Sequence, residues 1–192
     1  AILAMGLLAV IDFWDGDRKF GYGGYKYDGR WQKVAKAMAD HYGLKAGDRV
    51  LDVGCGKGFL LYDFTQVVPG IKVEGIDISK YAIDNSKEEV RSYLKVGDAI
   101  SLPYQDKSFD LVISLNTLHN LYCYDLVTAM KEIERVGKKN KYVQVESYRT
   151  PEEKVNLLYW VLTGECYFTP DEWKWFYDLA GYTGDYSFIY FE

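Results

Sequence analysis

A short acidic and glycine-rich turn carries the clearest chemical signal in the sequence. An acidic residue precedes three alternating glycines, in the order Asp52, Gly54, Gly56 and Gly58. The apolar runs at residues 50–53 and 59–61 indicate a strand that leads through this turn into a helix. Glycines let a ligand come close to the backbone at a helix N-terminus. Because open α/β sheets bind ligands at the carboxyl ends of their strands, the turn is the predicted ligand site.

Three kinds of glycine-rich turn fit a strand–turn–helix unit, and neighbouring residues separate them. The dinucleotide fingerprint requires a glycine where the chain has Phe59, which disfavours a nicotinamide oxidoreductase. A phosphate-binding P-loop requires Ser or Thr after its lysine, whereas Lys57 is followed by Gly58. The remaining pattern, an acid followed by Gly-x-Gly-x-Gly, resembles the first motif of the class I S-adenosylmethionine-dependent methyltransferases.

This resemblance implies S-adenosylmethionine as the cofactor. It carries a sulfonium and an ammonium against one carboxylate, so Asp52 suits it, whereas a pyrophosphate would be repelled. Asp77 stands at the end of the predicted strand at residues 72–78, where a carboxylate can accept hydrogen bonds from both ribose hydroxyls. Neighbouring Ile78 is assigned to the cofactor as well. The alternative role for Asp77 is a helix cap, for which Ser79 is better placed.

Two further segments extend the predicted cofactor site. In the resembled family, an acidic residue at the place of Asp98 hydrogen-bonds the adenine amino group, and the backbone amide of Ala99 meets the ring. Asn116 follows the continuously apolar segment at residues 109–115, which is typical of a strand buried on both faces. Its place at a strand end predicts contact with cofactor and acceptor.

His119 and Glu146 are the candidate proton acceptors. Methyl transfer is an in-line displacement, so the enzyme must align the acceptor and, for a hydroxyl or an ammonium, remove a proton. His119 has a side chain that ordinarily titrates near neutrality, and Glu146 emerges from a strand end toward the same crevice. The alternatives are a histidine that only packs beside a helix and a glutamate that is only solvated.

The segment before the first long helix is rich in glycine and tyrosine and reads as an ordered loop. In the resembled family this region commonly covers the cofactor and gates the substrate. We expect Tyr22 and Tyr25 to close over the methyl group, with Tyr25 in a catalytic position, and Arg30 to reach the methionine carboxylate. The alternative is that the tyrosines pack and that Arg30 is a surface charge.

Periodicity and capping residues predict an α/β fold: a doubly wound, mostly parallel twisted sheet with helices on both faces and an antiparallel strand near the C-terminus. We expect strands at residues 49–53, 72–78, 94–99, 109–115, 141–145 and 186–191. We expect helices at residues 31–42, 59–68, 79–90, 125–136, 151–163 and 170–180. In the helix after Thr150, the residues expected on the buried face are Val155, Leu158 and Leu162.

The chain is predicted to form one methyltransferase domain over residues 1–192. Within it we expect an N-terminal cap and gating segment (1–30), a cofactor-binding core (31–146), a helical lid insertion with the final helix (147–180) and a last strand (181–192). The apolar residues 1–11 are too few to span a bilayer, and they predict a helix that packs on the domain or on a second subunit of a homo-oligomer.

Composition narrows the function classes. A net charge of −5 gives no basic footprint for nucleic acid. Three cysteines, odd in number and widely spaced, indicate a reducing compartment and hence a cytoplasmic protein. With two histidines and no Cys/His cluster, no metal site is expected. The predicted function is methyl transfer to an oxygen or nitrogen of a small molecule, and the alternative is a non-catalytic S-adenosylmethionine-binding regulatory or scaffold subunit.

Overall fold

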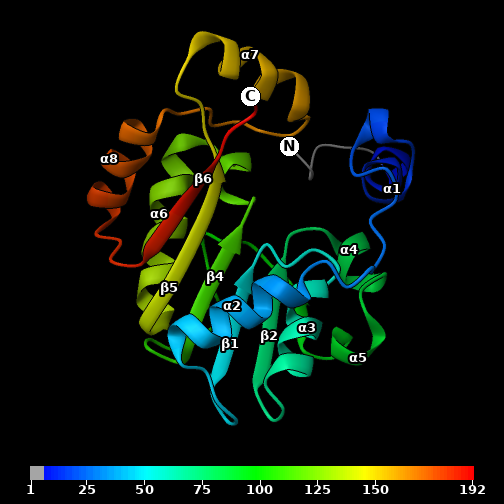
Figure 1. The fold of residues 1–192 in the computed structure, drawn as a ribbon, viewed down its shortest axis with the longest axis vertical. Helices are drawn as coiled ribbons and strands as arrows, with labels where there is room; N and C mark the ends of the chain where they lie inside the picture. Colours follow the sequence, from blue (N-terminus) through cyan, green and yellow to red (C-terminus); the bar gives the residue numbers. More distant parts are fainter. Residues whose placement is uncertain (1–6) are drawn as a thin grey trace.

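A computed structural model describes residues 7–192 and forms a twisted parallel sheet between two layers of helices (Figure 1). The sheet has six strands in the order β3-β2-β1-β4-β5-β6. Their bounds are Arg49–Val53 (β1), Lys72–Asp77 (β2), Leu94–Val96 (β3), Phe109–Leu115 (β4), Gly137–Glu146 (β5) and Asp185–Ile189 (β6). Every neighbouring pair is parallel. This confirms the predicted α/β class.

Alternating side chains in the central strands divide the core into two. Val50 and Leu111 face a cluster with the helices Gln32–Tyr42 (α2) and Phe59–Val67 (α3). Leu51 and Val112, one position along each strand, face a cluster with Cys123–Val136 (α6) and Pro170–Ala180 (α8). Successive side chains of a strand point to opposite faces, so a run buried throughout requires helices on both sides.

The last strand differs from the prediction. β6 runs parallel to β5, with Val143 beside Tyr186, and the expected antiparallel strand is absent from the described residues. The helix α8 lies between these strands in sequence and packs against α6 on one face of the sheet. A helix that crosses the face returns the chain to the end where β5 began, so the following strand is parallel.

Two helices also differ from their predicted form. The helix predicted at residues 79–90 is divided into Lys80–Asp84 (α4) and Glu88–Arg91 (α5) around Asn85 and Ser86, residue types that compete with helical hydrogen bonding. The helix Pro151–Trp160 (α7) lies at the top of the molecule in Figure 1, clear of the sheet. The helix ends at Trp160 rather than at residue 163, and the residues expected on its buried face are each exposed over about half of their surface: Val155, Leu158 and, past the helix end, Leu162. Leu157 is buried instead.

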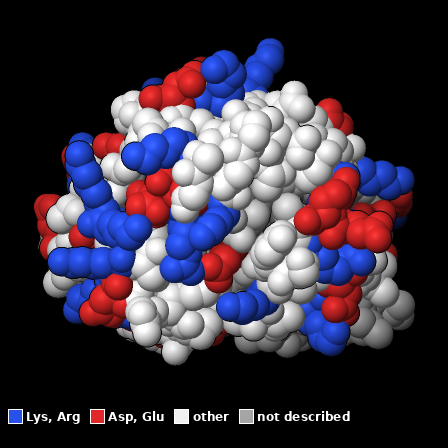
Figure 2. Space-filling model, turned by 90° about the horizontal axis from the view of Figure 1, so that it is seen from below, with Lys and Arg blue, Asp and Glu red and all other residues white. Residues whose placement is uncertain are grey.

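The N-terminal helix Leu7–Asp15 (α1) and the short helix Arg18–Phe20 (η2) lie beside the upper end of the sheet (Figure 1). Residues 1–6, part of the apolar segment predicted to pack on the domain or a second subunit, lie outside the described residues. No helix among residues 7–192 is long and apolar enough to cross a membrane. On the face in Figure 2, positive and negative side chains are interspersed with uncharged surface.

Candidate functional site

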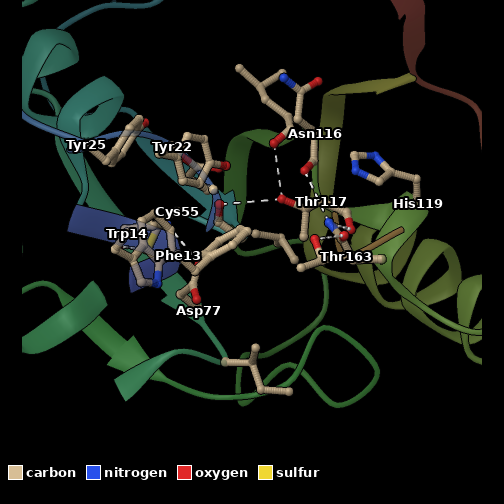
Figure 3. A pocket seen from close by; sticks show the side chains of 18 of the residues that line it. Phe13, Trp14, Tyr22, Tyr25, Cys55, Asp77, Asn116, Thr117, His119 and Thr163 are labelled. Atoms are coloured by element: carbon tan, nitrogen blue, oxygen red, sulfur yellow. Dashed lines mark hydrogen bonds between the residues drawn. The ribbon is translucent and has the colours of Figure 1, made fainter. Parts of the chain in front are cut away.

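A cavity of about 570 Å³ opens at the carboxyl ends of the central strands, within the size range of small-molecule sites. It lies where β1 and β4 are neighbours, the point at which the strand order reverses. Such a switch point leaves a crevice because the two connections leave in opposite directions. Figure 3 shows aromatic side chains of the N-terminal segment on one side and Asn116, Thr117 and His119 on the other.

The three glycines of the central turn have different roles. Gly54 and Gly56 line the cavity with φ angles of 86° and 53°, which favour glycine. A Cβ atom on Gly54 would lie 2.0 Å from Thr117 Oγ1, so this glycine permits β1 and β4 to end side by side. Gly58 is not among the cavity-lining residues, and its Cβ would lie 2.8 Å from a methyl carbon of Leu94. We infer that Gly58 serves the packing of α3 rather than a ligand.

Two carboxylates stand together beside this turn. Asp77 accepts hydrogen bonds from the backbone N–H groups of Gly56 and Ser79, both at 2.8 Å. Asp52 is buried, lines the same cavity, and accepts no hydrogen bond at its carboxylate from the described residues. Burial and then the charge of Asp77 raise the pKa of Asp52 to about 8. The pair therefore forms a site that a cationic group would stabilise.

The other predicted cofactor residues also line the cavity. Ile78 follows β2, and Asp98 and Ala99 follow β3, so these residues extend the lining beyond the glycine turn. Asp98 accepts a hydrogen bond from the backbone N–H of Ile100 at 3.1 Å, which fixes the direction of the loop. The ends of β1, β2 and β3 thus contribute to one wall of the cavity.

Asn116 has a strained backbone and an unpaired polar group. Its φ angle is 54°, in the left-handed region that non-glycine residues seldom adopt. Its Oδ1 atom is buried and has no partner among the described residues, and the residue lines the cavity. Backbone strain and an orphaned acceptor at the same residue are typical of functional sites.

His119 and Glu146 come together on the opposite wall. His119 Nε2 lies 3.6 Å from Glu146 Oε2, and the residues are only 5% and 8% exposed. Burial lowers the pKa of His119 to about 4 and raises that of Glu146 to about 7. His119 Nδ1 and Glu146 Oε2 have no hydrogen-bond partner among the described residues. The pair is therefore predominantly uncharged near pH 6, with Glu146 the more basic member near neutrality.

The N-terminal segment forms the remaining wall from aromatic rings. Tyr22 stacks on Trp14 with ring centroids 5.1 Å apart, and Tyr25 stacks on Phe59 at 4.9 Å. Both tyrosines line the cavity, as predicted for a covering segment. Although Tyr22 is 46% exposed overall, desolvation of its hydroxyl and then the charge of Asp77 raise its pKa to about 12, and burial raises the pKa of Tyr25 further. Both phenols are therefore protonated at neutral pH, so they can donate a hydrogen bond but do not serve as bases.

A buried ion pair attaches this segment to the glycine turn. Lys57 Nζ lies 2.6 Å from an Asp15 carboxylate oxygen and donates to the backbone oxygen of Tyr25 at 3.1 Å. The hydroxyl of Tyr81 donates to the same carboxylate at 2.8 Å. The Trp14 indole donates to Ser79 Oγ at 3.1 Å. These contacts join α1 to α4 and to the turn before α3.

Arg30 lies at the edge of the cavity with its charge already paired. Its guanidinium donates to both carboxylate oxygens of Asp28 at 2.6–3.0 Å, and its side chain is mostly exposed. Arg18, a lining residue without an assigned role in the sequence, donates to the backbone oxygen of Gly21 and stacks 4.1 Å above the Trp160 ring. Both arginines are thus engaged by the covering segment and α7.

Several residues that line the cavity were not predicted from the sequence. Trp14 touches the glycine turn, since a Cβ on Gly56 would lie 3.1 Å from its ring. Thr117 fills the place beside Gly54. The segment after α7 contributes Val161, Leu162 and Thr163. The apolar character of residues 1–11 signalled a packed segment, but nothing local in the sequence indicated what it packs against. Residues 7–192 contain no cluster of three His, Cys, Asp or Glu side chains suited to a metal ion.

The described residues fit S-adenosylmethionine. The unpaired Asp52 carboxylate beside Asp77 suits a cationic group, and Gly54 and Gly56 leave room at the backbone for a ligand. Asp77, Ile78, Asp98 and Ala99 would hold the adenosine part. All of these residues line the same cavity.

Comparisons with known proteins agree with this geometry. A family model described as a methyltransferase domain matches residues 44–181. An uncharacterized methyltransferase of Schizosaccharomyces pombe is 33% identical over 112 residues, which cover 52% of this chain and 40% of the relative. A demethylmenaquinone methyltransferase of Lactobacillus johnsonii is 36% identical over 133 residues, which cover 65% of this chain and 52% of the relative. The chain thus spans about half the length of the curated relatives it matches.

A solved structure extends the likeness to the fold. The YcgJ protein of Bacillus subtilis matches with a TM-score of 0.64 at 23% identity, over 77% of this chain and 67% of that protein. Because the family model covers residues 44–181 and the sheet and glycine turn have the expected form, the resemblance inferred from the sequence is confirmed. The chain belongs to the methyltransferase-domain family and has the Rossmann-like fold of the class I S-adenosylmethionine-dependent methyltransferases.

Proposed function

We propose that this protein transfers a methyl group from S-adenosylmethionine to an oxygen or nitrogen atom of a small-molecule acceptor. The observation that carries the proposal is the position of Asp52. Asp52 is buried in the same cavity as Asn116 and Glu146, which stand at the ends of the neighbouring strands β4 and β5 and carry buried oxygens without a partner among the described residues. One cavity therefore has a pair of carboxyl groups, Asp52 and Asp77, whose ionised form a cationic cofactor would stabilise, and a separate polar place for an acceptor.

The chain's own residues would perform three tasks. S-adenosylmethionine supplies an electrophilic methyl group. Asp77 and the glycine turn would hold the cofactor, and the aromatic rings of Trp14, Tyr22 and Tyr25 would exclude water from it. Glu146 would take the proton of the acceptor, because its pKa of about 7 matches a base that works near neutrality. His119, uncharged through its burial, would pack beside Glu146 and limit the water around its carboxyl group.

The proposal includes the division of the chain. We assign residues 1–30 to a cap that gates the site, of which 7–30 are described, and residues 31–146 to the cofactor core. Residues 147–180 would be a lid with the final helix, supported by the cavity-lining position of Trp160. Residues 181–192 hold the last strand. We also propose a cytoplasmic location, supported by three unpaired cysteines at positions 55, 123 and 166.

Two measurements together test the function. Calorimetric titration with S-adenosylhomocysteine should give saturable 1:1 binding, and the binding should be weaker in Asp77→Ala. A screen of small alcohols, phenols and amines with S-adenosylmethionine, read by mass spectrometry, should yield a product heavier by one methylene unit. Binding without any product across the screen would favour the alternative, a cofactor-binding regulatory or scaffold subunit. Absence of binding would contradict both.

A further inference from the structure

We propose that the acceptor is a small amine, bound as its ammonium form between the carboxylate of Glu146, the amide oxygen of Asn116 and the ring of Tyr22. This inference rests on the proposed function and narrows it from oxygen or nitrogen to nitrogen. It also fixes the charge of the molecule that enters the site.

Two buried oxygen atoms in this part of the cavity have no partner among the described residues and require a ligand that donates hydrogen bonds. Glu146 Oε2 and Asn116 Oδ1 are buried, line the cavity and have no partner among the described residues. An ionised carboxylate and an amide oxygen are acceptors only. Glu146 is more than nine-tenths buried, so leaving its oxygen unpaired has a substantial free-energy cost. A ligand that brings N–H groups and a positive charge would satisfy both atoms.

The cationic side chains near the cavity are engaged elsewhere. Lys57 is paired with Asp15, and Arg30 is paired with Asp28. Arg18 is held by the backbone of Gly21 and the face of the Trp160 ring. An anionic acceptor would place its charge near the Glu146 carboxylate, which would repel it, while Arg18, a lining cation without a carboxylate partner among the described residues, is held against the Trp160 ring. A neutral alcohol would leave the Glu146 charge uncompensated.

Aromatic rings complete the place for a cation. Tyr22 is 46% exposed, lines the cavity and lies edge to face with Phe13 at a centroid distance of 5.2 Å. Figure 3 shows Tyr22 across the cavity from Asn116 and His119. The negative potential on a ring face attracts ammonium groups. Carboxylate, amide oxygen and ring together favour an ammonium over an uncharged group.

The proton balance of the reaction fits this arrangement. The ammonium gives one proton to the Glu146 carboxylate, which frees the nitrogen lone pair. The lone pair forms the new N–C bond while the S–C bond of the sulfonium donor breaks, with its electron pair retained by sulfur. The product is a methylated ammonium beside protonated Glu146, which returns its proton to solvent when the site opens. Positive charge passes from sulfur to nitrogen, and no further reactant is needed.

Three probes that share a ring but differ in charge test the proposal: benzylamine, benzyl alcohol and benzoate. Each is titrated calorimetrically at pH 7.5 into the full chain saturated with S-adenosylhomocysteine. Benzylamine should bind at least tenfold more tightly than benzyl alcohol, and benzoate should bind more weakly than either. Glu146→Gln, close in shape but uncharged, should abolish the preference for the amine. Glu152→Gln, at an exposed position on α7, is the matched control and should retain it.

Each result separates this inference from the proposed function. Equal binding of amine and alcohol by the wild-type chain, or a preference for benzoate, would overturn the inference while binding of S-adenosylhomocysteine still supports the function. An amine preference that survives in Glu146→Gln would overturn the role of the carboxylate. The affinity of that variant for S-adenosylhomocysteine reports whether it has folded. If it has not, the wild-type comparison of the three probes decides the inference.

Discussion

The Nε2 atom of His119 lies 3.6 Å from Oε2 of Glu146. His119 follows β4 and Glu146 ends β5, and both residues line the same cavity. The distance exceeds that of a hydrogen bond, and burial rather than mutual attraction shifts both pKa values. It lowers the pKa of His119 to about 4 and raises that of Glu146 to about 7. Both shifts favour uncharged side chains. As the pH rises, His119 therefore stays neutral and Glu146 is the residue that loses a proton.

The first prediction is the pH dependence of turnover. If Glu146 must be ionised, kcat/KM rises with pH through about 7 and stays level above it until the acceptor itself titrates. Glu146→Gln should reduce the rate by roughly 10²–10⁴-fold, the range of general-base catalysis. His119→Asn should lower the rate less and leave the midpoint in place. Full rates and the same profile in both variants would mean that catalysis is by positioning alone.

The second prediction concerns Asp77. Its carboxylate accepts two backbone hydrogen bonds at 2.8 Å within the turn. Asp77 also lines the cavity, so its remaining lone pairs can accept hydrogen bonds from a ligand bound there. Asp77→Ala should weaken S-adenosylhomocysteine binding by about 1.5–3 kcal/mol, roughly 10–150-fold, as expected for hydrogen bonds to a charged group. Calorimetric titration measures the change. Asp84→Asn, in the exposed pair with Lys80, is the control. Unchanged affinity in Asp77→Ala would contradict the ribose assignment.

The third prediction separates stability from function at Asp52. Its pKa in the folded protein is about 8, against an ordinary value near 4, so the folded state holds the proton more tightly than the unfolded state. The free energy of unfolding of the cofactor-free protein therefore falls as the pH rises from about 4 to about 8. Asp52→Asn removes this loss and should raise Tm at pH 8 more than at pH 4.

The same variant should bind the cofactor less well. A neutral amide does not compensate an ammonium group, which S-adenosylhomocysteine retains, so the affinity of Asp52→Asn for this ligand should fall by about tenfold or more. Thermal unfolding at two pH values and calorimetric titration measure the two effects. Asp40→Asn, exposed on α2, should change neither. A destabilised Asp52→Asn at pH 8 would show that the carboxylate has a partner in solution.

The parts of the fold that the sequence predicts are those with a local cause. β1, β4 and α8 follow from apolar runs, a glycine turn and a capping box at Thr169, which the structure contains. The exposure of Leu158 and the direction of β6 depend on where α7 and α8 pack, which no nearby residue specifies. Apolar residues at helical spacing predict that a helix forms. They do not predict which surface the helix packs against.

The candidate site divides in the same way. Asp52, Asp77 and Asn116 were predictable because strand ends in a parallel sheet meet at one edge. Trp14 and Lys57 were not, because their partners are distant in the sequence: Trp14 binds Ser79, and Lys57 binds Asp15. Contacts of this kind form between segments that have no common repeat or motif.

The last prediction concerns the attachment of the N-terminal segment to the glycine turn. Lys57 is nearly fully buried, and its ammonium contacts the Asp15 carboxylate and the Tyr25 backbone oxygen, so it holds α1 and the tyrosine loop over the cavity. Removing one partner of a buried pair leaves the other charge uncompensated. Asp15→Asn should therefore favour opening of the segment.

Trypsin measures this opening, because the segment contains Arg18, Lys19 and Lys26 as cleavage sites. Cleavage of Asp15→Asn there should be about tenfold faster than in the wild type, as the loss of a charged hydrogen bond implies. Saturating S-adenosylhomocysteine should slow it in both proteins if the segment closes over the cofactor. Asp17→Asn, whose partner Lys19 is exposed, should behave as the wild type. Equal cleavage rates in Asp15→Asn and Asp17→Asn would mean that the aromatic contacts of Trp14 and Tyr22, rather than the ion pair, hold the segment closed.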